Sequence, residues 1–123
     1  MLSRIVLIYA MPEEKRDAAA ETLKAAGLPV LFIGRERYGL SLKAVLEMSP
    51  ETAAGDGIDE TFAVLHGFSR DSLDPALEAL RSVGIGLKAV TTPTNLDWSG
   101  EKLYKSLRAE REAIKRAKNR KKR

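Results

Sequence analysis

The stretch Ile5-Val-Leu-Ile-Tyr9-Ala-Met-Pro12 decides the fold, because its apolar run has the length of one buried strand and ends at a proline. A related stretch, Phe62-Ala-Val-Leu-His66-Gly-Phe-Ser69, lies 57 residues further along the chain. The same offset places Gly27 over Gly84. This constant spacing predicts an internal duplication.

Each copy reads as strand, helix and strand, which places the two repeats at residues 4–34 and 61–91. In the second copy, leucines and an alanine between Leu73 and Leu80 recur at helical spacing. Pro75 would remove a backbone hydrogen bond from the second turn of a helix capped by Ser69. We therefore expect this helix to start at Asp71 or Ser72, with Ser69 in the preceding loop.

The first strand of each copy is apolar at nearly every position, as is typical of strands buried on both faces. Leu87-Lys-Ala-Val90 contains a charge, as edge strands do. We therefore predict a three-layer α/β fold, in which a small sheet of four mainly parallel strands has the order 2-1-3-4. Two βαβ repeats related by a pseudo-twofold axis form this sheet, helices cover both faces, and a C-terminal helix follows.

A ferredoxin-like α+β sandwich is the alternative architecture, because two strand-helix-strand units suit that antiparallel arrangement as well. The final helix could cover its otherwise open face. The sequence pattern leaves both topologies open.

The segments outside the repeats complete one domain over residues 1–114. A short helix is expected at residues 40–48, and residues 49–60 are rich in turn formers and acids, which predicts a mobile linker. A final helix begins near Asp97 or Ser99, and past Ile114 its turns are expected to be solvated or disordered. Residues 115–123 then form a basic tail.

The charge of the chain is divided unevenly. It holds 21 Lys and Arg against 17 Asp and Glu, a net charge of +4. From Glu101 to the C-terminus, eleven basic and three acidic residues give +8, so the first hundred residues carry −4. The basic character therefore belongs to the C-terminal end.

Several kinds of site are excluded by composition. The chain has no Cys and one His, which excludes disulfides, thiolate metal sites and a multi-His metal centre within one chain. It has neither a GxGxxG nor a GxxxxGK[ST] motif, so we expect no nucleotide cofactor. The apolar run at residues 5–11 is too short to span a bilayer, and we expect a cytoplasmic protein with no membrane partner.

The carboxyl ends of the strands are the expected binding site. In an open parallel sheet ligands bind where the strand order reverses, here between the first and third strands. That position would bring residues 9–11 together with residues 66–69, and residues 91–95 would enter from the fourth strand. The candidate ligand-binding residues are His66, Gly67, Ser69, Thr92, Thr94, Asn95 and Trp98.

Each of these residues also has a structural interpretation. His66 could act as an acid or base, but its repeat partner is Tyr9, which favours a half-buried ring whose polar tip finds a partner. Asn95 suits an Asx turn before the last helix, and Trp98 suits a packing contact at its start. Ser69 has no evident base except His66, so no catalytic residue is assigned, and an enzyme is the less favoured class.

The tail is a candidate for binding nucleic acid without sequence preference. Its cations are Lys115, Arg116, Lys118, Arg120, Lys121, Lys122 and Arg123. They could contact phosphates, but no aromatic residue is present for stacking on bases. The competing interpretation is a solubilising end.

The second copy resembles a family of small bacterial proteins known as domain of unknown function 3783. The resemblance rests on Val64-Leu-His-Gly-Phe-Ser69 and on Leu87-Lys-Ala-Val-Thr-Thr-Pro-Thr-Asn95 followed by Trp98, and it covers residues 61–108. It implies no reaction, substrate or cofactor. It directs attention to the Gly-Phe turn and to the Thr-Pro-Thr-Asn segment.

Taken together, these patterns predict a non-enzymatic binding or regulatory module. Its site would lie at the strand carboxyl ends and would take a small anionic ligand or a protein partner. A nucleic-acid-associated protein acting through the basic tail is the alternative.

Overall fold

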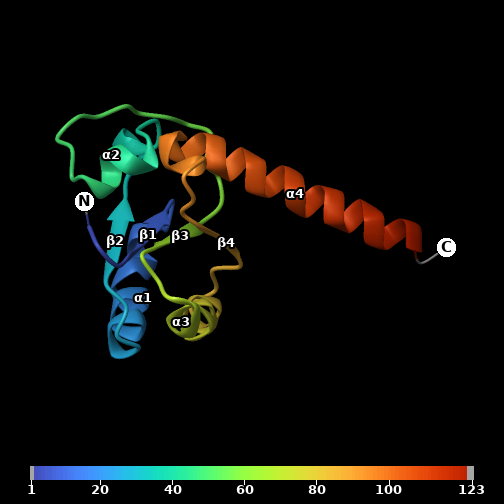
Figure 1. Ribbon diagram of the computed structural model, residues 1–123, viewed down its shortest axis with the longest axis horizontal. Coiled ribbons are helices and arrows are strands. Elements are labelled where there is room, and N and C mark those ends of the chain that lie inside the picture. The colour runs from blue at the N-terminus through green and yellow to red at the C-terminus, as the bar shows by residue number, and fades with distance from the viewer. Residues whose placement is uncertain (1, 122–123) are drawn as a thin grey trace.

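The fold is built on a sheet of four strands in the order β2-β1-β3-β4 (Figure 1). The computed structural model describes residues 2–121, without the side chains of residues 120 and 121. Strands β1 (Ile5–Tyr9) and β3 (Phe62–His66) form the centre of the sheet, and β2 (Val30–Ile33) and β4 (Leu87–Val90) form its edges. The predicted strand order is confirmed.

The two central strands run in opposite directions. β1 pairs in parallel with β2, and β3 pairs in parallel with β4. Between the two pairs, β1 and β3 are antiparallel, with Leu7 opposite Val64 and Tyr9 opposite Phe62. The sheet is therefore mixed, and mainly parallel as predicted.

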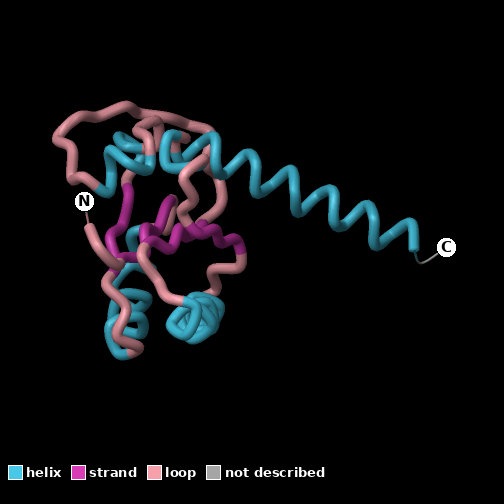
Figure 2. Tube along the Cα trace, in the orientation of Figure 1, coloured by secondary structure: helices cyan, strands magenta, loops and turns pink. Residues whose placement is uncertain are grey.

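The ferredoxin-like alternative is wrong. That fold separates the two parallel strands of each βαβ unit by inserting another strand. Here β1 lies directly beside β2, and β3 directly beside β4. Helices also cover both faces of the sheet, so the three-layer prediction is confirmed (Figure 2).

Alternation along the strands assigns each apolar residue to one of two cores. Ile5, Leu7 and Tyr9 belong to one buried cluster, whereas Val6 and Ile8 belong to the other. Both central strands are thus apolar at every position except His66, because each serves two cores. Helices α1 (Glu13–Ala25) and α3 (Arg70–Ser82) cover the face of the sheet to which Val6 and Ile8 contribute.

The opposite face is covered by shorter elements and by the start of the last helix. These are Tyr38 and Leu40 after η1 (Arg35–Arg37), α2 (Leu42–Leu46), η2 (Asn95–Asp97) and the first turns of α4 (Gly100–Lys121). Leu103 and Tyr104 of α4 are buried in this core. A Cβ atom at Gly100 would lie 2.4 Å from Cε2 of Tyr9, so the close approach of α4 to the sheet requires glycine there.

Residues 49–60 contain no helix or strand, yet they pack against the rest of the molecule. The amide of Ala53 donates to the carbonyl of Glu36, and that of Gly39 donates to the carbonyl of Ala53 at 2.7 Å. Ile58 is buried in the core. Mobility of this linker stays a prediction.

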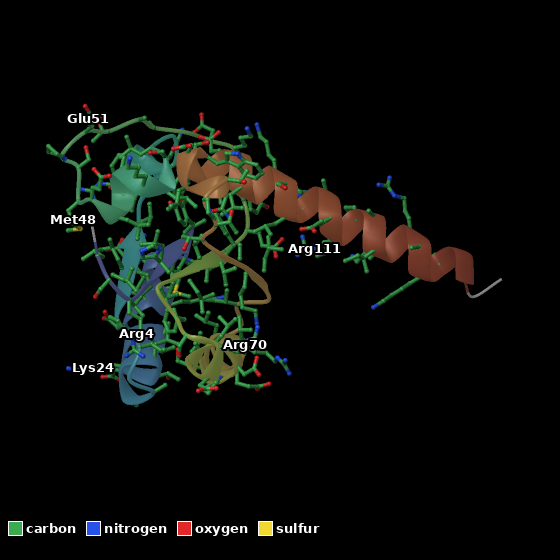
Figure 3. The ribbon with its side chains drawn as sticks, in the orientation of Figure 1. Arg4, Lys24, Met48, Glu51, Arg70 and Arg111 are labelled. Atoms are coloured by element: carbon green, nitrogen blue, oxygen red, sulfur yellow. The ribbon has the colours of Figure 1, made fainter. Side chains whose placement is uncertain are left out.

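Helix α4 leaves the body of the molecule and projects away from it (Figure 1). It has 22 residues and continues past Ile114 without a break to Lys121. Side chains crowd around the sheet and become sparse along α4 beyond Arg111 (Figure 3). Among the described residues, no helix has the length and apolarity needed to cross a bilayer.

Candidate functional site

The carboxyl ends of β3 and β4 bring together half of the predicted strand-end rim, which is the set of residues 9–11, 66–69 and 91–95. Because these strands are parallel neighbours, His66 at the end of β3 lies beside Thr91, which follows β4. The Nδ1 atom of His66 and the hydroxyl of Thr91 form a hydrogen bond of 2.7 Å. The polar tip of the half-buried His66 ring has therefore found a partner within the protein.

The other half of the predicted rim lies at the opposite end of the sheet. The expectation that residues 9–11 and 66–69 would line one crevice is wrong, because β1 and β3 are antiparallel. Tyr9 lies opposite Phe62, and His66 lies opposite Ile5. Because β3 runs opposite to β1, the predicted site between the carboxyl ends of these two strands is not formed.

Gly67 allows a close approach, but the approaching group is the chain itself. The residue has φ +79°, which favours glycine. A Cβ atom here would lie 1.8 Å from the carbonyl oxygen of Ser3. The N-terminal segment therefore occupies the space that an anion would need beside this backbone.

Ser69 caps helix α3, which differs from the predicted start at Asp71 or Ser72. The helix begins at Arg70, and the Ser69 hydroxyl accepts a hydrogen bond from the amide of Ser72. Pro75 lies inside the helix. The amide that Pro75 lacks would have bonded to the carbonyl of Asp71, an exposed residue whose carbonyl water can solvate.

Thr92 and Asn95 hold one another in a closed turn. The Thr92 amide donates to Oδ1 of Asn95 at 2.8 Å, and the Asn95 amide donates to the Thr92 hydroxyl at 3.0 Å. The side-chain amide of Asn95 donates to the carbonyl of Val90 at 3.0 Å. Asn95 is buried, and its polar atoms serve the structure of this turn. Thr94 is exposed.

Trp98 joins the start of α4 to the body. Its half-buried ring packs against the core, and Nζ of Lys102 lies 4.7 Å from the ring centroid. Its position fits the packing role that the sequence allowed.

The predicted tail cations are continuous with α4. Lys115, Arg116 and Lys118 are exposed on the projecting part of the helix, and the structure gives them no ion pair with any described side chain. Arg120 and Lys121 belong to the described backbone but not to the described side chains, and Lys122 and Arg123 lie outside the described residues.

Two arginines of α4 are partly neutralised by acidic residues of the linker. Arg111 forms a bidentate contact with Glu60, at 2.8 Å for each nitrogen–oxygen pair. The hydroxyl of Tyr104 donates to Asp59, which also faces Arg108 at 3.4 Å. The hydrogen bond from Tyr104 lowers the pKa of Asp59, and the hydrogen bond from Arg111 lowers the pKa of Glu60. Arg108 and Arg111 are therefore paired, whereas the described cations beyond Arg111 form no ion pair with a described side chain.

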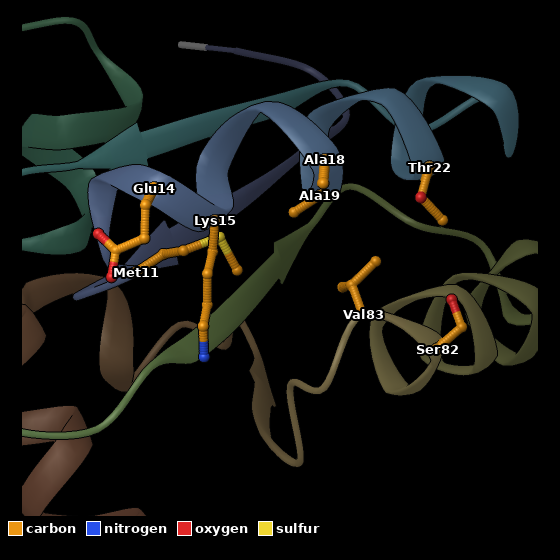
Figure 4. A pocket seen from close by; sticks show the side chains of 8 residues that line it. All are labelled: Met11, Glu14, Lys15, Ala18, Ala19, Thr22, Ser82 and Val83. Carbon is orange, nitrogen blue, oxygen red and sulfur yellow. The ribbon is translucent and has the colours of Figure 1, made fainter.

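One surface depression lies between α1 and α3 (Figure 4). It measures about 440 Å³, and Met11, Ala18, Ala19 and Thr22 on the α1 side face Ser82 and Val83 at the end of α3. Glu14 and Lys15 stand at its edge. Small side chains on two packed helices create this space, and no motif in the sequence marks it.

A second depression, of about 470 Å³, lies between β4 and α4. We call it the β4–α4 groove. Its residues on the strand side are Gly86, Leu87 and Lys88, and those on the helix side are Leu107, Glu110, Arg111, Ile114, Lys115 and Lys118. The spacing of Leu107 and Ile114 was visible in the sequence, but the exposure of Ile114 beside a sheet edge was not. Across the described residues, no group of three or more potential metal ligands is present.

Comparison with known proteins agrees with the resemblance found in the sequence. Residues 61–114 match the model of a family described as a domain of unknown function (DUF3783). The match runs from the residue before β3 into α4 and covers a little less than half of the chain. No curated protein and no solved structure matches the chain.

Proposed function

We propose that this protein is a non-enzymatic module that binds nucleic acid through the projecting part of α4. The observation that carries the proposal is the exposure of Lys115, Arg116 and Lys118 on a helix that has left the body. Binding of nucleic acid through the basic C-terminal end was one of the two functions expected from the sequence. We propose it for a bacterial protein of the cytoplasm.

We call the projecting part of α4 beyond Arg111 the arm. Its side chains suit the phosphates of nucleic acid. A helix with its side chains is about 10–12 Å wide, and the major groove of B-DNA is about 12 Å wide. Lysine and arginine side chains on such a helix release condensed counterions when they contact phosphates. The described arm beyond Arg111 has no aromatic side chain, so stacking on bases is not expected.

The competing proposal, a small anionic ligand at the strand-end rim, has less support. His66, Ser69, Thr92 and Asn95 already form hydrogen bonds within the protein. A ligand would have to replace these bonds. The arm requires no such exchange, because its described cations have no ion-pair partners there.

The test compares salt dependence of binding in full-length variants. Lys115, Arg116 and Lys118 are replaced together by Gln, which preserves helix propensity. Binding to fluorescent duplex DNA and to single-stranded RNA is followed by anisotropy between about 50 and 200 mM salt. If all three side chains contact phosphates, the slope of log affinity against log salt for duplex DNA should flatten by about 3.

A matched control removes the same charge elsewhere. Lys24, Lys43 and Arg70 are exposed on α1, α2 and α3, and their replacement by Gln should leave the slope nearly unchanged. Equal flattening in the two triple variants would show that only net charge matters. The proposal would be refuted if the arm variant bound both nucleic acids with the affinity and salt dependence of the wild type.

A further inference from the structure

We propose that the β4–α4 groove binds an extended segment of a partner protein, which adds a strand to β4 and presents alternating acidic and apolar side chains. This protein-binding surface goes beyond the proposed function and shares Lys115 and Lys118 with the nucleic-acid arm. It rests on the open edge of the sheet, on the apolar floor of the groove and on the sign of its charge.

The backbone at the start of β4 is available for strand addition. The Thr91 amide donates to the carbonyl of Leu65 at 3.0 Å, so odd-numbered residues of this strand point their backbone groups toward β3. The backbone groups of Gly86 and Lys88 consequently point away from the sheet. No further strand lies beside β4 among residues 2–121. An added strand would pair with these outward groups.

The open edge is short, and the groove follows its length. At the far end of β4, the Asn95 side chain already donates to the carbonyl of Val90. The strand residues that line the groove are Gly86, Leu87 and Lys88, the part of the edge that Asn95 does not cover. The occupant is therefore a short segment of roughly the length of an ordinary edge strand.

Apolar side chains line the floor of the groove and part of its wall. Leu87 is buried, Leu107 is half-buried, and Ile114 is 55% exposed. Leu107 and Ile114 are separated by two helical turns and lie on one face of α4. Ile114 is the one large apolar side chain exposed on the described part of this helix. An apolar side chain of the partner would cover it.

The charge of the rim selects acidic neighbours for that apolar side chain. Lys115 and Lys118 line the groove without an ion pair in the described part of the chain, whereas Arg111 is already bound to Glu60. Lys88 points its amine toward the Leu77 carbonyl of α3, at 3.4 Å. Glu110 is the acidic residue among those lining the groove. The remaining cations therefore favour carboxylates.

The same charges disfavour two other occupants. Edge-to-edge pairing of two copies of this chain would bring the lysines of both grooves together, and like charges oppose that contact. Nucleic acid would meet Lys115 and Lys118, but its phosphates would gain nothing from Leu87, Leu107 and Ile114. A segment with both carboxylates and aliphatic side chains matches both parts of the surface.

The experiment uses ¹⁵N-labelled full-length protein and two synthetic probes. One peptide alternates Glu with Val, and the other alternates Lys with Val; both have neutral ends. The Glu-Val peptide should shift the amide signals of Gly86, Lys88 and Ile114 in a saturable manner. The Lys-Val peptide should bind more weakly. Equal binding of the two peptides, or shifts confined to other elements, would overturn the proposal.

Two variants separate the contributions of charge and backbone. Reversing both charges with Lys115→Glu and Lys118→Glu should weaken the Glu-Val peptide about tenfold and favour the Lys-Val peptide, because two attractive exposed pairs become repulsive. Lys88→Pro should abolish strand addition while keeping the bonds of β4 to β3, because the lost amide points outward. Unaltered spectra elsewhere show that each variant is folded.

A charge-reversal control and a competition complete the test. Lys24→Glu with Arg70→Glu, on α1 and α3, should leave the affinity for the Glu-Val peptide within about twofold of the wild type, because these residues lie outside the groove. Duplex DNA should leave the amide signals of Gly86 and Lys88 unshifted. If DNA shifts these amides as the peptide does, the groove is a nucleic-acid surface and the inference is wrong.

Discussion

Gly67 and Ala10 each follow a central strand, and both have left-handed backbones, with φ +79° and +60°. Their surroundings differ, because a Cβ atom at Gly67 would collide with the carbonyl of Ser3. We expect Gly67→Ala to lower the free energy of unfolding by about 2–4 kcal/mol, since backbone strain and this collision add. Urea denaturation measures the change.

Ala10→Gly is the matched substitution. It relieves a left-handed alanine, so the free energy of unfolding should stay within about 1 kcal/mol of the wild type. A Gly67→Ala protein as stable as the wild type would contradict the assigned role of Gly67, which is to let the N-terminal segment pass.

Tyr9 has a buried hydroxyl with no hydrogen-bond partner among the described residues. Burial raises the pKa of this phenol, so it stays neutral over the physiological range. We expect Tyr9→Phe to raise the free energy of unfolding by about 1 kcal/mol, because an unsatisfied polar atom leaves the core. Thermal unfolding tests this expectation.

Tyr104→Phe should act in the opposite direction. Its hydroxyl donates to Asp59, so this substitution removes a hydrogen bond instead of an unpartnered group. A loss of stability in Tyr9→Phe as large as that in Tyr104→Phe would indicate that the Tyr9 hydroxyl is satisfied after all.

That the polar residues at the strand ends serve the structure could be predicted from their types, but the pattern of their hydrogen bonds could not. Asn95 was expected to form an Asx turn, but its side chain accepts from the amide of Thr92, which precedes it, so the two residues form a capping box instead. The cap formed by Ser69 was not predicted, because Pro75 in the second turn indicated a later start of the helix. Asp71 is an exposed residue, so water can solvate the carbonyl that lacks its partner at Pro75, and this exposure depends on the tertiary fold.

At the scale of elements, the linker is attached to α4 by Asp59 and Glu60. Hydrogen bonds from Tyr104 and Arg111 lower the pKa of each carboxyl relative to the unfolded chain. Their stabilisation is thus fully present above the ordinary values near pH 4 and is lost as the pH falls through the lowered ones. We expect the melting temperature to fall as the pH drops below about 4, and to fall less in Asp59→Asn with Glu60→Gln.

The control for this acid effect removes two exposed carboxyls that form no ion pair with a described residue. Glu51→Gln with Asp74→Asn should retain the acid sensitivity of the wild type. Calorimetry over a pH series compares the three proteins. The attachment would be unsupported if the Asp59 and Glu60 variant lost as much stability in acid as the wild type.

The direction of β3 could not be predicted from burial. A strand between two cores is apolar throughout whether its neighbour is parallel or antiparallel. The chain after Ile33 crosses the opposite face through α2 and enters β3 at Phe62, beside the end of β1 at Tyr9. The path of the linker sets the direction of β3, and no pattern in the turn-rich linker sequence allows that path to be predicted.

The two outer strands also differ in a way that the constant offset concealed. Val6 pairs with Val30, whereas the matching residue of the second copy, Ala63, pairs with Lys88. The offset between β2 and β4 is thus one residue longer than that between β1 and β3. Because one residue reverses the face of a strand, this slip decides that Leu87, not Lys88, faces the core beside α4. The duplication itself stays a prediction.

At the scale of the whole molecule, positive charge is concentrated on the part of α4 that has left the body. The uneven charge was evident from the sequence. That one unbroken helix would carry basic residues as far as Lys121 was not, since few apolar residues follow Ile114. The β4–α4 groove was equally hidden, because it exists only where a departing helix passes a sheet edge.

The most direct measurement of the central claim is a map of amide shifts in ¹⁵N-labelled full-length protein titrated with a short duplex DNA. The proposed function predicts shifts concentrated at residues 112–121, decreasing steeply as salt is raised. The contrary result is a set of shifts concentrated at His66, Gly67, Ser69 and residues 92–95 with α4 unchanged. It would move the binding site back to the strand ends.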